Sequence, residues 1–300
     1  MSYFPAIENS CFFHGLLTEF FHCVFQCAFV MNTLMRYGLW LFLGCAVAAP
    51  TCGQIVPDAG VSGQKPVVLS TGGGLPLVHI VTPTAGGVSV NQYRQFDVQA
   101  KGVVLNNNRD PLVAAQLGGE VAANPFLAGG AARVIVNQVN SSNPSYLLGP
   151  LEIAGKRAEL VIANPSGLEV NGAVFLNASR TTLLTGRVNL SNGGLSGYTV
   201  GDGAIRIEGA GLDARQSEYT ALLARAVEVN AKLHAGHLTI VAGQNEIAAG
   251  DMGDAMPVGN SLSAAPAPLF AVDVKALGGM YAESILLVGT EHGVGVKNHG

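Results

Sequence analysis

An all-β fold, with its strands stacked as a parallel β-helix, is predicted by three features of this 300-residue sequence. Short segments alternate apolar and polar residues from Leu77 onward, which is the period of half-buried strands. Glycine is abundant, with 39 residues, and favours frequent turns between such strands. Similar strands also recur: AIRIE at 204–208 and AVEVN at 226–230 define a repeat of about 20 residues, which is typical of a solenoid.

The alternation assigns a direction to the side chains of these strands. Arg206, Glu228 and Asp273 are expected to point outward, and their apolar neighbours are expected to stack inward: Ile205, Ile207, Val227 and Val229. No window carries a helical apolar stripe over 12 residues, so little helix is expected. A β-sandwich or β-propeller remains an alternative, because three dipeptides suit two-residue hairpin loops: Asn171-Gly172, Asn192-Gly193 and Asp202-Gly203.

The N-terminal 53 residues differ from the rest, since all five cysteines lie before position 53. From Met31, the positive residue Arg36 is followed by an apolar run and then by small residues, which is the pattern of a signal peptide. We expect a signal peptide over 31–53, exported by the Sec machinery and cleaved within 48–53. Residues 1–30 contain no Lys or Arg and are interpreted as a mis-assigned N-terminal extension, with an extended signal peptide as the alternative. For the whole N-terminal segment the alternative is a buried helix. A cysteine-free remainder suits passage through an oxidising compartment.

Residues 54–300 are expected to form one β-helix domain. Its first part, 54–75, is rich in Gly and Pro and lacks a clear period. Residues 248–269 contain three prolines and predict a loop that leaves the coil. The final VGVKNHG carries no polar cap, so the domain is predicted to be truncated at its C-terminus. A net charge of -4 gives no electrostatic reason to expect nucleic acid as a partner.

Two asparagine-proline turns are set among these strands: Asn124-Pro125-Phe126-Leu127 and Asn164-Pro165-Ser166-Gly167-Leu168. Proline fixes its own φ and disfavours the helical region for the residue before it. The asparagine side chain then bonds the backbone two residues on. Gly167 can take a positive φ, which closes the second turn. From such a local bond alone, replacing either asparagine is expected to cost about 1 kcal/mol.

These turns and the flanking stretch 133–186 closely resemble the secretion domain of filamentous-haemagglutinin-type exoproteins, the large passengers of two-partner secretion in Gram-negative bacteria. Residues 87–108 resemble the family's segment before the first Asn-Pro turn, with Asn91, Tyr93 and Phe96 as supporting residues. Val90 stands where that segment has a histidine. Val170 and Ala173 stand where many toxin-delivering relatives have a cysteine pair, which argues against the cysteine-bearing subgroup of the family.

The resemblance implies a right-handed β-helix capped at its N-terminus by short antiparallel strands. It implies a secretion domain that the periplasmic modules of a partner outer-membrane transporter recognise, with the two Asn-Pro turns as the recognition motifs. The product would reach the medium or the cell surface through the periplasm. The full-length protein would be an adhesin or haemagglutinin, or the carrier of a contact-dependent toxin, and the sequence does not identify a host or neighbouring-cell receptor.

No catalytic activity, cofactor or metal is expected. His234 and His237 are three residues apart and fall on opposite faces of a strand. The glycines at 72–74 lack the Lys-Ser/Thr of a phosphate loop, and Ser196 lacks the pattern of a nucleophile elbow. Two alternatives remain: a secreted β-helix polysaccharide lyase or hydrolase, which should stack acidic and basic residues on one face, and an autotransporter passenger, which needs a barrel of its own.

Overall fold

The computed structural model describes residues 55–257, 267–291 and 294–299, with the backbone alone over 251–254. The signal peptide predicted over 31–53 and the extension over 1–30 lie outside the described residues. Among the described residues, no helix is long and apolar enough to span a membrane.

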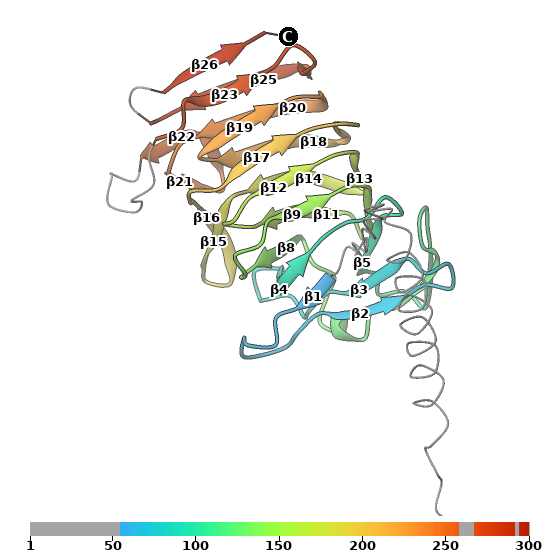
Figure 1. Cartoon of the computed structure of the whole chain (residues 1–300). Helices are drawn as coiled ribbons and strands as arrows, with labels where there is room; N and C mark the ends of the chain where they lie inside the picture. Colours follow the sequence, from blue (N-terminus) through green and yellow to red (C-terminus); the bar gives the residue numbers. More distant parts are fainter. Residues whose placement is uncertain (1–54, 258–266, 292–293, 300) are drawn as a thin grey trace, which may run out of the picture. The chain divides into compact units, whose positions relative to one another are not determined.

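The described strands stack as successive coils around one apolar core, and the coils build three walls of parallel strands (Figure 1). The first wall contains β4 (Val88–Phe96), β8 (Val134–Val139), β11 (Ala158–Ala163), β14 (Ala178–Leu184) and β25 (Ser284–Gly289). The second wall contains β5 (Val103–Asn107), β10 (Pro150–Gly155), β13 (Ala173–Leu176) and β24 (Gly279–Tyr281).

The third wall is a separate six-stranded sheet of β9 (Ser145–Leu147), β12 (Leu168–Val170), β17 (Ala204–Ile207), β19 (Ala226–Val229), β23 (Phe270–Val274) and β26 (Gly295–Asn298). Two long strands, β18 (Leu212–Ala224) and β20 (Lys232–Ala242), bend through a corner, so they belong to both the first and the second wall. The predicted parallel β-helix is therefore confirmed, and the β-sandwich and β-propeller alternatives are wrong.

The predicted repeat of about 20 residues corresponds to the pairing of parallel strands in the third wall. Ile205 pairs with Val227 and Arg206 pairs with Glu228, in parallel strands of neighbouring coils. The four apolar residues predicted to point inward are fully buried, while Arg206, Glu228 and Asp273 are partly exposed. Stacking the apolar side chains of successive coils removes them from water, which is the main favourable term in such a repeat.

The N-terminal end is closed by a cap that breaks the repeat, as predicted. Its antiparallel strands are β1 (Ile55–Pro57), which pairs with β4, and the hairpin of β2 (Val67–Ser70) and β3 (Pro76–His79). Between β5 and β8 the chain leaves the coil over residues 109–131, which we call the cap excursion. The cap excursion contains the antiparallel pair β6 (Leu112–Ala115) and β7 (Gly119–Ala122) and the 3₁₀ turn η2 (Pro125–Leu127).

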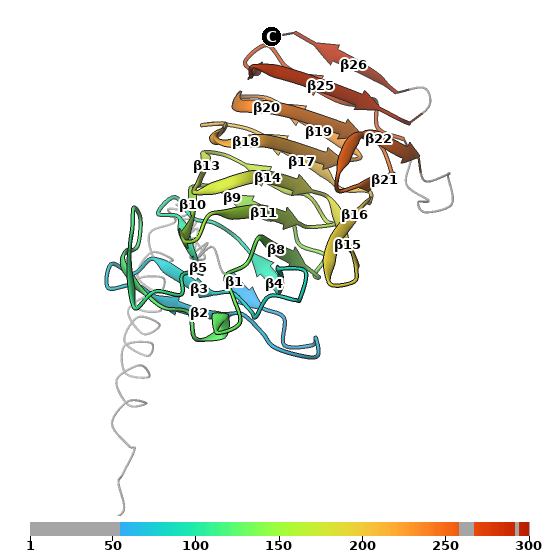
Figure 2. The same cartoon turned by 180° about the vertical axis from the view of Figure 1, so that it is seen from behind.

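A second antiparallel sheet projects from the coils (Figure 2). It contains β15 (Gly186–Ser191), β16 (Gly194–Val200), β21 (Asn245–Ala248) and β22 (Asp251–Pro257). Of the three Gly-containing dipeptides, Asn192-Gly193 closes its hairpin, and both residues have positive φ, 51° and 74°, as a type I′ turn requires. The loop predicted over 248–269 is wrong for its first part, because β22 adds a strand to this sheet, where ladder bonds to β21 outweigh the poor strand propensity of its sequence.

Candidate functional site

The first Asn-Pro turn is an N-capped 3₁₀ turn within the cap excursion. Asn124 has an extended backbone (φ -77°, ψ 118°), and its Oδ1 accepts from the amide of Phe126 at 3.0 Å. Its Nδ2 donates to two carbonyl oxygens, those of Ile80 and Asn106, each at 2.9 Å. The side chain is 3% exposed. This asparagine therefore joins three separate segments of the cap in addition to closing its own turn.

The other residues of this turn divide between the interior and the surface. Leu127 is buried in the main core, whereas Pro125 is exposed and Phe126 is half-buried. The ring of Phe126 meets the ring of His79 edge-on, with centroids 6.5 Å apart. Burial lowers the pKa of His79 below its ordinary value, because the charged imidazolium is poorly solvated there.

The second Asn-Pro turn closes the corner between β11 and β12. The amide of Ser166 donates to Oδ1 of Asn164 at 2.9 Å, and the amide of Gly167 donates to the Asn164 carbonyl at 3.1 Å. Gly167 has φ of 118°, which confirms the predicted use of glycine. Nδ2 of Asn164 donates to the Asn143 carbonyl at 2.9 Å and to Oγ of Ser145 at 3.0 Å. The turn is thus tied to the preceding coil.

This turn also has a buried and an outward part. Asn164 and Leu168 are fully buried, while Pro165 and Ser166 are half-buried. The hydroxyl of Ser166 donates to the carbonyl of Ser141 at 3.1 Å. The side-chain partners of the two asparagines are different residues in different segments. The structure therefore gives the two turns the same local geometry but no shared partner.

The cost of about 1 kcal/mol expected for losing either asparagine is too low. Each side chain makes three hydrogen bonds, not one. Removing a buried side chain with such bonds leaves backbone groups without partners, and each such group costs about 1–3 kcal/mol. Substituting Asn124 or Asn164 therefore disturbs folding too strongly to isolate a recognition role.

The three supporting residues lie in the interior of the cap. Oδ1 of Asn91 accepts from the Val81 amide at 2.9 Å. The rings of Tyr93 and Phe96 pack with centroids 4.9 Å apart, and burial raises the pKa of the Tyr93 hydroxyl. That hydroxyl donates to Oδ1 of Asn137 at 3.1 Å. These residues hold the cap together and present no surface to a partner.

Sequence reasoning missed the asparagine triplet 106–108, which is fully buried or nearly so. Nδ2 of Asn106 donates to the Ala122 carbonyl at 2.9 Å, and Nδ2 of Asn108 donates to the Val121 carbonyl at 3.0 Å. Oδ1 of Asn107 accepts from the Ala132 amide at 2.8 Å. The available signal was three consecutive asparagines at the end of an apolar strand, where polar side chains need specific partners.

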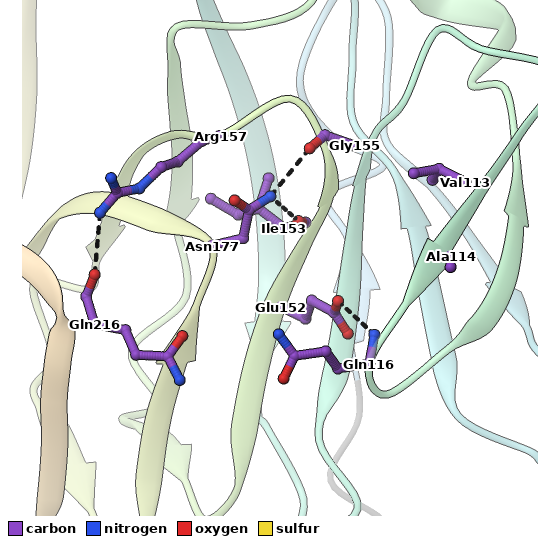
Figure 3. Close-up of a pocket in the computed structure, with 9 residues that line it drawn as sticks. All are labelled: Val113, Ala114, Gln116, Glu152, Ile153, Gly155, Arg157, Asn177 and Gln216. Atoms are coloured by element: carbon purple, nitrogen blue, oxygen red, sulfur yellow. Dashed lines mark hydrogen bonds between the residues drawn. The ribbon is translucent and has the colours of Figure 1, made fainter.

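A cavity of about 320 Å³ lies between the β6–β7 hairpin and the wall of the coil (Figure 3). Its carboxylate, Glu152, is 4% exposed, and its two oxygens accept from the amides of Gln116 and Leu117, both at 2.7 Å. Nη2 of Arg157 donates to the Gln216 carbonyl at 3.0 Å. Both charged side chains thus serve as anchors: Glu152 attaches the cap excursion to β10.

The two histidines considered in the sequence as possible metal ligands, His234 and His237, make ring-stacking contacts. His234 stacks on Tyr281 and His237 stacks on Tyr219, each pair with ring centroids 4.9 Å apart. Nδ1 of His237 also lies 2.8 Å from the hydroxyl of Ser284. Over the part of the chain that the structure describes, no group of three or more His, Cys, Asp or Glu side chains is arranged to hold a metal ion.

Comparison with known proteins agrees with this arrangement of cap and coils. The family model of the TPS secretion domain, where TPS denotes two-partner secretion, matches residues 53–300. The chain belongs to the TPS secretion domain family. The crystal structure of the filamentous hemagglutinin secretion domain matches this TPS domain with a TM-score of 0.73 and 36% sequence identity, and the match covers 81% of each chain.

Curated relatives are much longer than this chain. Toxin CdiA of Yersinia pestis is 46% identical over 267 residues, which are 89% of this chain and 8% of that protein. tRNA nuclease CdiA-2 of Burkholderia pseudomallei is 50% identical over 240 residues, 79% of this chain and again 8% of the relative. The TPS domain therefore spans about 8% of the length of the curated relatives it matches.

Membership of the family settles the type of protein. The chain is the secretion domain of an exoprotein of the filamentous hemagglutinin and CdiA kind, built as a right-handed parallel β-helix. A TPS domain implies an outer-membrane transporter as the second partner, and exoproteins with such domains are secreted to the surface of Gram-negative bacteria. Fold and family support a non-enzymatic secretion role for this region; the nuclease in the relatives' names describes those proteins as wholes.

Proposed function

We propose that residues 54–300 are read by the periplasmic modules of a cognate outer-membrane transporter, after a signal peptide over 31–53 has directed the chain through the Sec machinery into the periplasm. The observation that carries this proposal is the pair of Asn-Pro turns, which repeat one local geometry at two unrelated places. Bonds of this kind, from a backbone amide to an asparagine side chain two residues earlier, need no distant contacts and can form in a chain that is still unfolded elsewhere. An extended chain also offers β edges to a receptor strand.

The transporter-recognition motifs would be Asn124 to Leu127 and Asn164 to Leu168. Within them the outward residues Pro125, Phe126, Pro165 and Ser166 can be replaced with little effect on the folded core, in which Leu127 and Leu168 are buried. Asn91, Tyr93 and Phe96 would support recognition only by holding the cap together. This division makes recognition testable without destroying the fold.

The experiment is secretion of the chain from cells with and without the cognate transporter. Secreted and periplasmic amounts are measured for the unaltered chain, Phe126→Ser and, as a control, Tyr146→Ser. Tyr146 is a 43% exposed aromatic residue on β9, outside both turns. Phe126→Ser is expected to lower the secreted fraction several-fold while the denaturant midpoint of the refolded chain shifts little. Release without the transporter, or equal secretion of the two variants, would contradict the proposal.

For the full-length product we propose delivery of a toxin on contact with a neighbouring cell, with adhesion as the second candidate. The relatives favour toxin delivery, because the CdiA proteins that match this chain are named as toxins or nucleases. A growth competition of cells that make the full-length product against cells that lack its gene tests this: inhibition of the second kind of cell supports toxin delivery. Binding to host cells without growth inhibition supports adhesion.

A further inference from the structure

The cap excursion leaves the β-helix at the corner between the second and the first wall of the first coil. Asn107 is the last residue of β5, and Ala132 lies just before β8, which begins at Val134. In the next coil the same corner is made by residues 155–157, with no insertion. Twenty-odd residues of the cap excursion therefore stand where later coils have a short turn, and the two ends of that excursion must be brought together before the first coil can close.

The side chain of Asn107 makes that closure. Its Oδ1 accepts from the Ala132 amide at 2.8 Å, and its Nδ2 donates to the Ala132 carbonyl at 3.0 Å. The same Nδ2 donates to the carbonyl of Lys156, in the corner of the second coil, at 2.8 Å. The side chain is fully buried. One amide group thus binds the start of the excursion to its end and to the coil that follows.

The neighbouring asparagines fix the excursion itself, so the triplet acts together. The side-chain amide of Asn108 donates to the Val121 carbonyl, and that of Asn106 donates to the Ala122 carbonyl. The Asn106 carbonyl in turn accepts from Nδ2 of Asn124, in the first Asn-Pro turn. Closing the corner at Asn107 therefore coincides with formation of the bond that attaches the first Asn-Pro turn to β5.

We propose that Asn107 is a positioning residue that couples closure of the cap to formation of the first complete coil, and that this event limits the rate at which the β-helix folds. Every later coil adds to an existing edge and mainly forms contacts one coil apart, whereas the first must pay loop closure before any edge exists. The part of this inference that concerns export rests on the proposed function. The part that concerns the folding rate does not.

Asn245 is the matched control. It too is a fully buried asparagine that begins an excursion from the coil, and its Nδ2 donates to the Gly243 carbonyl at 2.9 Å. Its Oδ1 accepts from the hydroxyl of Thr290 at 2.6 Å. Because it lies among the later coils, its bonds are expected to form after the rate-limiting step. The two substitutions should therefore change opposite rates.

Folding and unfolding rates of the purified chain test the inference directly. Asn107→Ala is expected to slow folding by at least about tenfold and to change unfolding much less, while Asn245→Ala is expected mainly to speed unfolding. If Asn107→Ala does not refold, Asn107→Ser takes its place, since a hydroxyl retains one of the three bonds. Faster unfolding with an unchanged folding rate in the Asn107 variant would overturn the proposal.

Secretion with the transporter present gives a second readout. Asn107→Ala is expected to lower the secreted amount more than Asn245→Ala does, even if their equilibrium stabilities are alike. Dependence of the unaltered chain on the transporter tests the proposed function, and the rates in vitro test the role of Asn107 without any transporter. Failure of either idea is therefore seen separately. Equal secretion of the two variants would also count against Asn107 as the starting point.

Discussion

The N-terminal cap and the later coils satisfy their buried backbone by different means. In the cap, asparagine side chains bind carbonyls and amides that have no ladder partner, as Asn124 does for Ile80 and Asn107 does for Ala132. In the coils, neighbouring strands pair with one another in parallel register, and the side chains between them are mostly aliphatic. Outward ion pairs add to this, such as Arg206 with Glu169.

The difference follows from repetition. A repeated coil offers each strand an equivalent strand above and below, so the backbone groups of its strands are paired without help from side chains, and side chains are needed mainly at corners such as the one that Asn164 closes. Among the described residues the cap has no further coil on its outer side, and its irregular segments use particular polar side chains. Specificity is thus concentrated in a few cap residues and spread thinly over the coils, which predicts that single substitutions cost more in the cap.

The largest effect is expected for Asn124→Ala. This change removes three hydrogen bonds and leaves the Ile80 and Asn106 carbonyls without that donor, so the free energy of unfolding should fall by about 3 kcal/mol. Denaturant unfolding measures it. Asn189→Ala is the control, since Asn189 bonds Thr199 in the projecting sheet and its loss should cost well under half as much. Comparable losses would remove the distinction between the cap and the rest.

Asn164→Ala sharpens the comparison, because the same local turn sits in the coils. It also loses three bonds, but one acceptor is the hydroxyl oxygen of Ser145, which can still donate its own hydrogen to another group. We expect a loss of about 2 kcal/mol. Hydrogen exchange should show where it acts: amides of β9 and β12 lose protection, while those of the cap excursion keep theirs. Loss of protection throughout the cap would mean that the two regions fold as one unit.

The sequence predicted the coils better than the cap for the same reason. The alternation of apolar and polar residues in AIRI and AVEV predicts which side chains are buried, because the face of a strand to which a side chain points depends only on its position. The bond from the Phe126 amide to Asn124 was also predictable, since it spans two residues. The partner of the same side chain at Ile80 lies 44 residues away, and no local pattern indicates it.

The sequence also failed where tertiary pairing overrides local preference. Strand β22 lies in a segment rich in Gly and Pro, and it forms because β21 presents an edge to it. The burial of Asn91 and Tyr93 is a further example. The resemblance pointed to them as motif residues, but only the fold shows that they face the interior, where Asn91 binds the Val81 amide.

A small effect is expected for Arg206→Gln in the coils. Arg206 bridges Glu169 at 2.9 Å and Glu228 at 3.1 Å, which aligns three coils in register. The Arg206 side chain is 43% exposed, so solvent screens these pairs and the loss should be about 0.5 kcal/mol. Arg187→Gln is the control, as the described residues show no ion pair for it. The difference between the variants should shrink in about 1 M salt, and a salt-independent loss would point to packing instead.

The smallest effect is expected from His79, and it adds a pH dependence that belongs to the cap alone. Burial lowers the pKa of His79 below its ordinary value of 6.5, so between the two values the unfolded chain holds a proton that the folded chain does not. The stabilising contribution is therefore complete above pH 6.5 and is lost as pH falls towards the folded pKa.

Unfolding measured between about pH 7.5 and pH 5, in the unaltered chain and in His79→Gln, isolates this contribution, because other titrating groups are common to both. The unaltered chain should lose more stability on acidification than the variant does. Hydrogen exchange should place the loss around η2, where the His79 ring meets Phe126. If acid instead weakens the coils first, the cap is not the region that responds to pH, and the contrast between individually specified cap bonds and repeated coil bonds would have to be redrawn.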